Sequence, residues 1–247
     1  MNYLDIHSHI LPAVDDGAKN IETSIKLLEM LKSQEVTHVI ATPHFYPDTD
    51  NAEEFAERTA KAYKDLNQAV VGADLPQIYL GCELHYFSGI GKSKALRQFA
   101  IKGTNYVLLE LSYGAEITKT ILKDIIDIQE CSGLIPILAH IERYSKVKGY
   151  KNLLKLISER GVLAQINAES VLSKEYAKTI EKLIKSGMVS FLASDTHSVA
   201  SRPPMIADAL KSIKQKFGSS AVTRLIIKSN KLLDEIEESN ANCQFNN

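Results

Sequence analysis

The chain has 247 residues, 45% of them hydrophobic, so it is long enough to bury a full core as one domain. Its 29 basic and 30 acidic residues leave a formal net charge of -1, which argues against a nucleic-acid-binding or membrane-surface protein. The N-terminus has no basic segment and no long apolar run, so we expect a cytoplasmic protein with no signal peptide and no membrane insertion.

Seven short apolar runs, each ending in polar residues, predict seven β-strands. They cover residues 3–9, 37–44, 77–85, 106–111, 135–141, 162–167 and 189–197. Segments with helical spacing of apolar residues lie between them, for example 21–31 and 117–126. This alternation implies parallel strands joined by crossover helices, and a repeat of this length favours a closed or nearly closed (β/α) barrel.

The chain changes character after the seventh predicted strand. Arg202 is followed by Pro203 and Pro204, and two further helices are predicted at 205–217 and 221–238. The polar tail 239–247 is predicted to be disordered. Because no linker or internal repeat divides the chain, we expect a single domain over residues 1–238.

Histidine and acidic residues stand at the carboxyl ends of six of the predicted strands, where parallel barrels carry their chemistry. Residues two apart on a strand face the same side, so two such pairs can point together into the barrel mouth. Two acids before Gly17, Asp15 and Asp16, could supply another ligand or form an ordinary turn. The strand-end candidates are His7, His9, His44, Glu83, Glu110, His140, Asp195 and His197.

Imidazole and carboxylate ligands without thiolates suit zinc, manganese or iron(II), and these candidates exceed what one ion needs. Two ions about 3.5–4 Å apart can activate water and clamp phosphoryl oxygens, as in many phosphatases and nucleases. Glu83 could bridge such ions, while Arg143 and Arg202 are placed to hold the remaining phosphate oxygens. The sequence therefore predicts a metal-dependent phosphohydrolase.

Some residues near these motifs have simpler explanations. His38 begins the second predicted strand at the opposite rim, so we expect it to be structural. His85 either supports a metal ligand or caps its strand, and Glu142 beside Arg143 is more typical of an ion pair or a surface residue. The cysteines are expected to be unpaired thiols, since they lack metal-type spacing and the Cys-x5-Arg signature of thiol phosphatases; they are Cys82, Cys131 and Cys243.

Six motifs stand in the order found in the polymerase and histidinol phosphatase (PHP) superfamily, which the chain resembles over nearly its full length. They are Asp5-Ile-His-Ser-His9, Thr42-Pro-His44, Gly81-Cys-Glu83, Glu110-Leu-Ser112, Ala139-His140 and Ser194-Asp-Thr-His197. Within that superfamily, segments 7–17, 139–144 and 194–198 look like the bacterial protein tyrosine phosphatases that accompany capsular and exopolysaccharide synthesis.

This resemblance implies a distorted seven-stranded (β/α)7 TIM-like barrel that holds two or three metal ions. Manganese is the metal it favours, with zinc or iron as alternatives. The implied activity is removal of phosphate from the tyrosine-rich tail of a bacterial tyrosine kinase, with Arg143 and Arg202 binding the phosphate. Position by position, the implied metal ligands are His7, His9, Asp16, His44, Glu83, Glu110, His140, Asp195 and His197.

The mechanism expected for such a site is in-line attack on phosphorus by a metal-bound hydroxide. Asp195 or a metal-bound water is a candidate general acid, although phenolate leaves readily without one. Aromatic residues after the ligand motifs could either wall a phosphotyrosine pocket or simply pack the loops. They are Phe45, Tyr46, Tyr86, Phe87, Tyr113 and Tyr144.

Four other functions use related features. A small-molecule phosphomonoesterase of the histidinol-phosphatase type would need the same metals. An amidohydrolase also begins with His-x-His, but it usually requires a metal-bridging Lys where Glu110 stands. A non-catalytic metal-binding or kinase-docking module would not require so complete a ligand set. A nuclease is disfavoured because no basic stripe follows the helices or loops.

Overall fold

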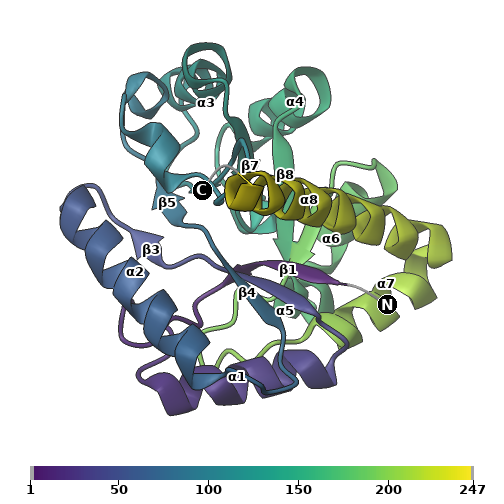
Figure 1. Ribbon diagram of the computed structural model, residues 1–247. Helices are drawn as coiled ribbons and strands as arrows, with labels where there is room; N and C mark the ends of the chain where they lie inside the picture. The colour runs from purple at the N-terminus through teal and green to yellow at the C-terminus, as the bar shows by residue number, and fades with distance from the viewer. Residues whose placement is uncertain (1–2, 246–247) are drawn as a thin grey trace.

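The computed structural model describes residues 3–245, whose strands form a curled parallel sheet surrounded by helices (Figure 1). Every strand pairing among these residues is parallel, as the alternation predicted. The strand order is β1-β2-β4 in one sheet and β3-β5-β6-β7-β8-β9 in the other. The strands are β1 (Leu4–Ser8), β2 (His38–Ala41), β3 (His44–Phe45), β4 (Gln77–Leu80), β5 (Glu83–His85), β6 (Tyr106–Glu110), β7 (Ile135–Leu138), β8 (Leu163–Asn167) and β9 (Phe191–Ala193).

Two of the predicted strands are each broken into two pieces. Pro43, which has no N–H to donate, lies between β2 and β3. Gly81 lies between β4 and β5, where an added Cβ would come within 3.0 Å of Ile40. Because of these breaks, residues 3–245 contain nine short strands where we predicted seven. The α/β architecture is confirmed, but a closed seven-stranded (β/α)7 barrel is not.

The first and last strand ends lie side by side. The Asp195 amide donates to the His7 carbonyl at 2.9 Å, and the His9 amide donates to the Thr196 carbonyl at 2.9 Å. The register of β1 against β2 also shifts between Asp5 and Ser8. These contacts bring the polar ends of the first and seventh predicted strands together.

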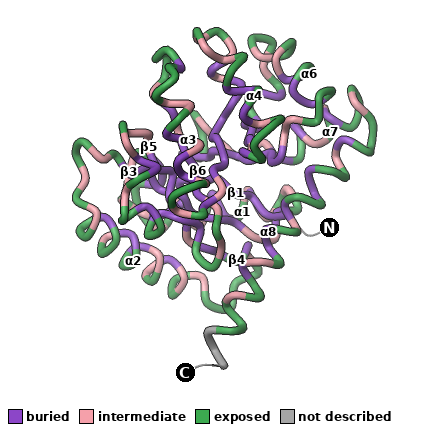
Figure 2. Tube along the Cα trace, turned by 90° about the horizontal axis from the view of Figure 1, so that it is seen from above, coloured by how far each residue is buried: buried purple, intermediate pink, exposed green. Residues whose placement is uncertain are grey.

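Helices surround the sheet, with their buried faces inward and their exposed faces outward (Figure 2). The Asn20 side chain caps α1 by accepting from the Thr23 amide at 2.9 Å, and Leu27, Leu28 and Leu31 of that helix are buried. The helices are α1 (Ile21–Ser33), α2 (Ala52–Ala69), α3 (Lys119–Ser132), α4 (Tyr150–Arg160), α5 (Ala168–Leu172), α6 (Ala177–Lys185), α7 (Ile206–Phe217) and α8 (Ser219–Phe245), with 3-10 turns at Ile90–Lys92, Leu96–Phe99 and Ile141–Tyr144.

The last helix differs from the prediction. We expected a helix over 221–238 followed by a disordered tail, but α8 continues to Phe245. Residues 246–247 of the predicted tail lie outside the described residues. That residues 1–238 form one domain stays a prediction.

One end of the curled sheet is covered by α8, which crosses in front of the strands in Figure 1. Leu232, Leu233 and Ile236 of this helix join an apolar cluster with strand residues, including Ile6. The Ser229 hydroxyl donates to the Leu4 carbonyl at 2.8 Å and accepts from the Leu4 amide at 3.1 Å. This end of the strands is therefore closed by apolar packing and satisfied hydrogen bonds. Among residues 3–245, no helix combines the length and apolar character needed to cross a membrane.

Candidate metal centre

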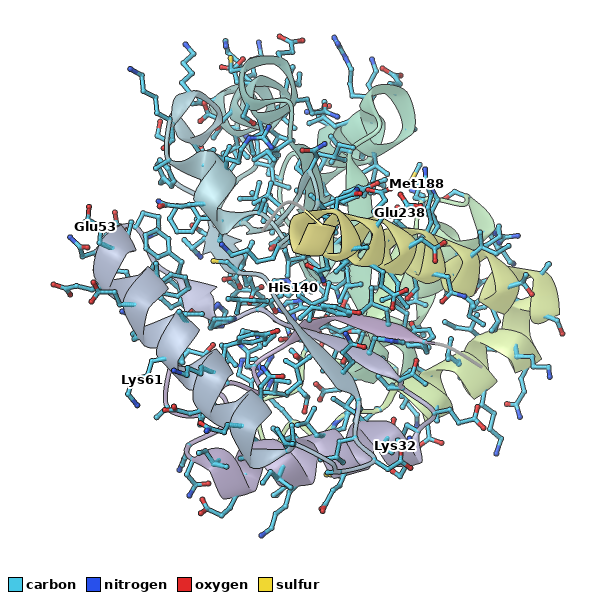
Figure 3. The ribbon with its side chains drawn as sticks, viewed as in Figure 1. Lys32, Glu53, Lys61, His140, Met188 and Glu238 are labelled. Atoms are coloured by element: carbon cyan, nitrogen blue, oxygen red, sulfur yellow. The ribbon has the colours of Figure 1, made fainter. Side chains whose placement is uncertain are left out.

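The predicted ligands converge at the other end of the strands. His140, labelled near the middle of Figure 3, is buried, whereas Glu53 and Lys61 lie at the left edge of that view. His140 Nε2 lies 3.0 Å from a Glu83 oxygen and 3.4 Å from a Glu110 oxygen. The other eight residues form three overlapping groups whose donor atoms lie within 4.8 Å of one another: His9, Asp16, His44 and His197; His7, His9, Glu83 and Asp195; and His44, Glu83 and Glu110.

Glu83, at the start of β5, is the centre of this arrangement. Its Oε2 atom lies 3.0 Å from His7 Nε2, 3.2 Å from His9 Nε2 and 3.0 Å from His44 Nδ1. Burial alone would raise the pKa of the Glu83 carboxyl, but His7, His140 and His9 outweigh it and hold that pKa well below its usual value. A buried carboxylate facing several imidazoles suits a bridge between two cations.

The two acids of the first loop have different surroundings. Asp15 is largely buried, accepts from the His44 and Gly17 amides, and lies 2.7 Å from His9 Nδ1. Burial opposes its ionisation, but the hydrogen bond with His9 holds the pKa of Asp15 well below its usual value. The Asp16 side chain is 67% exposed, and its Oδ1 lies 3.4 Å from His197 Nε2. Asp15 therefore orients His9, which leaves Asp16 as the acid directed at the cluster.

Gly17 is required for this loop to approach His9. A Cβ at this position would lie 2.2 Å from the His9 carbonyl oxygen, which no side chain tolerates. The Ala18 amide donates to the same oxygen at 2.9 Å. The Asp-Asp-Gly sequence is thus more than a generic turn, because its glycine allows both acids to reach the histidines.

Two candidate ligands have left-handed backbone conformations that are unusual for residues other than glycine. The φ angles are 34° at His140 and 52° at Asp195. The His140 amide donates to Gln165 Oε1 at 2.8 Å, and the Asp195 amide donates to the His7 carbonyl. Such conformations persist where surrounding contacts enforce them, and they turn both side chains off their strands into the cluster.

Both predicted arginines bind the same carboxylate oxygen. Arg143 Nη2 lies 3.0 Å from Asp195 Oδ2, and Arg202 Nη2 lies 2.7 Å from it. Burial disfavours the Asp195 anion, but His7 and His9 more than compensate and hold the pKa of Asp195 well below its usual value. The two guanidinium groups are about one-third exposed or less, so they can also meet a ligand from solvent. Together the two arginines could bind an anion beside the ligand cluster.

Two amides on β8 also belong to the site, although that strand ends in no predicted ligand. Gln165 Oε1 lies 3.2 Å from His7 Nδ1, and Gln165 Nε2 donates to Asn167 Oδ1 at 2.7 Å. Asn167 Nδ2 then donates to Asp195 Oδ2 at 2.6 Å. These side chains hold His7 and Asp195 in place. Their two-residue spacing at a strand end was the available signal, but amide side chains are not typical ligands of these metals, so the sequence did not single them out.

The remaining histidines have distinct surroundings. His38 begins β2 at the amino end and stacks on Tyr79 with ring centroids 6.0 Å apart, so the structural interpretation holds. His85 Nδ1 lies 3.2 Å from Glu110 Oε2, and its Nε2 lies 3.0 Å from the Ser112 hydroxyl. His85 therefore supports Glu110 instead of capping its strand.

The predicted aromatic cluster divides into packing residues and exposed ones. Phe45 and Tyr144 are buried in the core, and the Tyr86 hydroxyl donates to Asp124. Tyr46 is 40% exposed and stacks on His44 with centroids 5.0 Å apart, while Tyr113 is 78% exposed. Only these last two combine a position near the cluster or Arg143 with an exposed ring.

The donor set suits divalent cations. Three buried atoms that could bind a metal ion have no hydrogen-bond partner: Glu83 Oε2, His44 Nδ1 and His197 Nε2. Burying such atoms without a partner is unfavourable, and a cation would provide that partner. Although burial opposes protonation of His140, Glu110 and Glu83 raise its pKa to about 9. A metal ion would compete with this proton, so we expect metal binding to release protons.

The family assignment follows from the whole chain. Residues 3–234 match the family described as "Capsular polysaccharide synthesis, CpsB/CapC". The chain belongs to this family. Among curated relatives, it is 30% identical over 238 residues to the tyrosine-protein phosphatase CpsB of Streptococcus agalactiae serotype III (strain NEM316), covering 92% of this chain and 96% of that protein. It is also 30% identical over 221 residues to the tyrosine-protein phosphatase YwqE of Bacillus subtilis (strain 168), covering 87% and 85% of the two chains.

Solved structures agree with this assignment. The chain superposes with a TM-score of 0.83 and 28% identity on a chain from the crystal structures of YwqE from Bacillus subtilis and CpsB from Streptococcus pneumoniae, described as metal-dependent tyrosine phosphatases, covering 94% of each chain. The histidinol phosphate phosphatase of Lactococcus lactis, crystallised with zinc, histidinol and phosphate, has a TM-score of 0.56 and 12% identity, covering 90% of this chain and 94% of that one. This second likeness concerns the fold alone.

Proposed function

We propose that the protein is a metal-dependent protein tyrosine phosphatase that acts on a phosphorylated bacterial tyrosine kinase in polysaccharide synthesis. This proposal rests on one observation: the guanidinium groups of Arg143 and Arg202 both donate to Asp195, which belongs to the ligand cluster. A phosphoryl group needs both features at once, cations for its oxygens and a centre that activates water. The family description and the names of the relatives support the tyrosine specificity and the link to capsule synthesis.

The metal centre would use the nine carboxylate and imidazole residues in two or three overlapping sites. Bound divalent ions supply the chemistry of water activation and withdraw charge from phosphoryl oxygens. Manganese is the proposed metal, because the set is rich in carboxylates and contains no thiolate. The proposed ligands are His7, His9, Asp16, His44, Glu83, Glu110, His140, Asp195 and His197.

The protein's own side chains would bind and orient the substrate. Arg143 and Arg202 would hold the non-bridging phosphoryl oxygens and orient the phosphorus for in-line attack. Tyr46 and Tyr113 offer exposed rings against which a phosphotyrosine ring packs. Because both rings stand at the surface, a phosphotyrosine on a polypeptide can enter without burial of its flanking residues.

Two groups are poorly suited to covalent or acid catalysis. Cys82 is buried, and burial raises the pKa of its thiol well above the usual value, so it is not a nucleophile. The pKa of Asp195 is held well below its usual value, which argues against this residue as the general acid we considered. Asp195 would instead act as an anion that binds cations, and phenolate would leave without a strong acid.

Reconstitution tests this function. Protein stripped of metal is reloaded with manganese, zinc or iron and assayed with phosphotyrosine peptides, phosphoserine peptides and histidinol phosphate. We expect activity that depends on added metal, is greatest with manganese and prefers phosphotyrosine. Turnover of histidinol phosphate as fast as that of phosphotyrosine would overturn the substrate assignment, and activity that resists a strong chelator would overturn the metal assignment.

A further inference from the structure

A basic groove leads away from the candidate phosphate-binding arginines. A depression of about 310 Å³ beside Arg143 is lined by Tyr113, Tyr176, Lys146 and Lys148. A larger groove of about 760 Å³ shares Lys146 and Lys148 with it. This larger groove continues along α4 and α6, with the further lysines Lys151, Lys178 and Lys182 in its wall. The two hollows therefore adjoin at residues 146–148, and together they make up a basic path with Arg143 in its smaller part.

The charge of this path differs from that of the whole protein. Its lining contains six cationic side chains, Arg143 and five lysines, against two acidic ones, Glu116 and Glu175. The two acids pair with Lys148 and Lys146, each at 2.8 Å. The path thus carries four more positive than negative charges on a chain whose formal net charge is -1. Such a local excess attracts anionic ligands.

Three lysines line only the larger groove: Lys151, Lys178 and Lys182. Lys178 and Lys182 are four residues apart on α6, an arrangement in which like charges destabilise a helix. Lys151 lies in the first turn of α4, which contains no acidic residue and has no side-chain cap. None of the three forms an ion pair among residues 3–245. Their positive charges are therefore available to a ligand.

We propose that this groove, defined by Lys151, Lys178 and Lys182 together with the depression beside Arg143, binds acidic residues that flank the target phosphotyrosine in a polypeptide substrate. The inference rests on the proposed function and extends it from the phosphotyrosine to its neighbours. Carboxylates or further phosphates on the same chain would meet the lysines while Arg143 meets the target phosphate.

A polypeptide fits the groove better than a membrane surface does. The lysines line a concave path instead of a flat face, and the path leads to the site of reaction. Membrane binding by a basic surface is strengthened by exposed apolar side chains that insert among lipids. Of the large exposed hydrophobic residues described, only Tyr113 lines this path.

The test compares two variants with the same change in charge. The groove variant carries Lys151→Gln, Lys178→Gln and Lys182→Gln. The control carries Lys26→Gln, Lys64→Gln and Lys228→Gln, which replace exposed lysines of α1, α2 and α8 that line no part of the groove. Helices α1 and α2 lie on the other side of the molecule from α4 and α6 (Figures 1 and 2).

Both variants and the unaltered protein are assayed with manganese on three substrates: a phosphotyrosine peptide flanked by glutamates, the same peptide flanked by glutamines, and phenyl phosphate. We expect the groove variant to raise KM for the acidic peptide by about tenfold, with little change in kcat or in phenyl phosphate turnover. The control should differ from the unaltered protein by less than about twofold, and the groove effect should weaken at high salt.

An unchanged KM for the acidic peptide, or an equal rise in the control, would overturn the groove proposal. Binding of the fluorescently labelled acidic peptide is measured in parallel by anisotropy, so the groove is tested even without turnover. Loss of peptide turnover in all proteins, with groove-dependent binding retained, would refute the proposed function but not the groove. Groove-dependent binding to phosphatidylglycerol vesicles without binding to the acidic peptide would refute the polypeptide assignment.

Discussion

The two ends of the curled sheet use the same strands for opposite purposes. At the amino end, α8 covers the strands with leucines, and Ser229 satisfies both backbone groups of Leu4. At the carboxyl end, buried donors such as His197 Nε2 have no hydrogen-bond partner, and Asp195 has a left-handed backbone. The well-packed amino end stabilises the fold, and the carboxyl end can therefore keep buried polar groups that bind a ligand but do not add to stability.

The largest expected effect is at Glu83, the centre of the carboxyl-end cluster. Glu83→Gln removes the charge that faces His7, His9 and His44, so we expect kcat/KM to fall on the order of a thousandfold and bound metal to be lost. Metal content is measured by mass spectrometry and activity with a phosphotyrosine peptide. Glu142→Gln is the control, because Glu142 is equally buried but forms no ion pair within residues 3–245. The expectation of an ion pair or a surface position for Glu142 was therefore wrong: its carboxylate accepts from the Asn167 amide at 3.1 Å. Equal losses in both variants would contradict a special role for Glu83.

At the amino end of the sheet, we expect a substitution to lower the free energy of unfolding without lowering catalytic activity. Leu233→Ala removes a buried side chain of α8 and should lower the free energy of unfolding by about 2–5 kcal/mol, as urea denaturation measures. Activity per folded molecule should stay unchanged. Ile227→Ala on the same helix truncates a side chain that is 61% exposed, and we expect a change within about 0.5 kcal/mol. A drop in kcat for the Leu233 variant would show that the two ends are coupled.

A smaller effect is expected from the amides behind the ligands. Gln165→Ala removes the contacts with His7 Nδ1 and the His140 amide, which should weaken metal binding by about 10–100-fold. Gln77→Ala is the matched variant, since Gln77 is exposed at the start of β4. Metal affinity is measured by titration calorimetry, and stability is measured in chelator. Unchanged metal affinity with reduced stability would assign Gln165 a purely structural role.

Sequence patterns predicted which residues gather at the carboxyl end of the sheet better than they predicted how those residues contact one another. Strand periodicity and position were enough to place His44 and Glu83 at one rim, because side chains at the carboxyl ends of parallel strands must meet. They could not separate Asp15 from Asp16, since that difference depends on a loop folded onto His9 through Gly17. They also missed Gln165, whose role depends on a register between distant strands.

The fold, like the candidate site, was predicted in outline but not in detail. Apolar runs located every strand region, because burial on both faces leaves a continuous hydrophobic signal. The interruptions at Pro43 and Gly81 were not anticipated, although a proline inside a predicted strand is a known warning. The extent of α8 past residue 238 was missed because its last residues are polar and carry no apolar periodicity.

The smallest expected effect is at His38, which lies six residues before His44 in the same predicted strand. Burial lowers the pKa of His38 at the amino end, although Glu237 at 3.8 Å opposes that shift. A lowered pKa in the folded state means that His38 contributes stability above its unfolded pKa of about 6.5, and that this contribution is lost as pH falls through the folded pKa. His38→Gln should therefore flatten the fall in stability below about pH 6.5, as urea denaturation in chelator measures, and should leave activity unchanged.

NMR titration of the His38 ring gives the pKa directly. Glu237→Gln should lower that pKa further, because it removes the charge that favours the imidazolium. His44, by contrast, faces Glu83 at 3.0 Å among the proposed ligands, so added manganese should broaden or shift its ring signals while leaving those of His38 in place. If His38 responds to the metal as strongly as His44 does, the division of the sheet into a structural end and a chemical end is wrong.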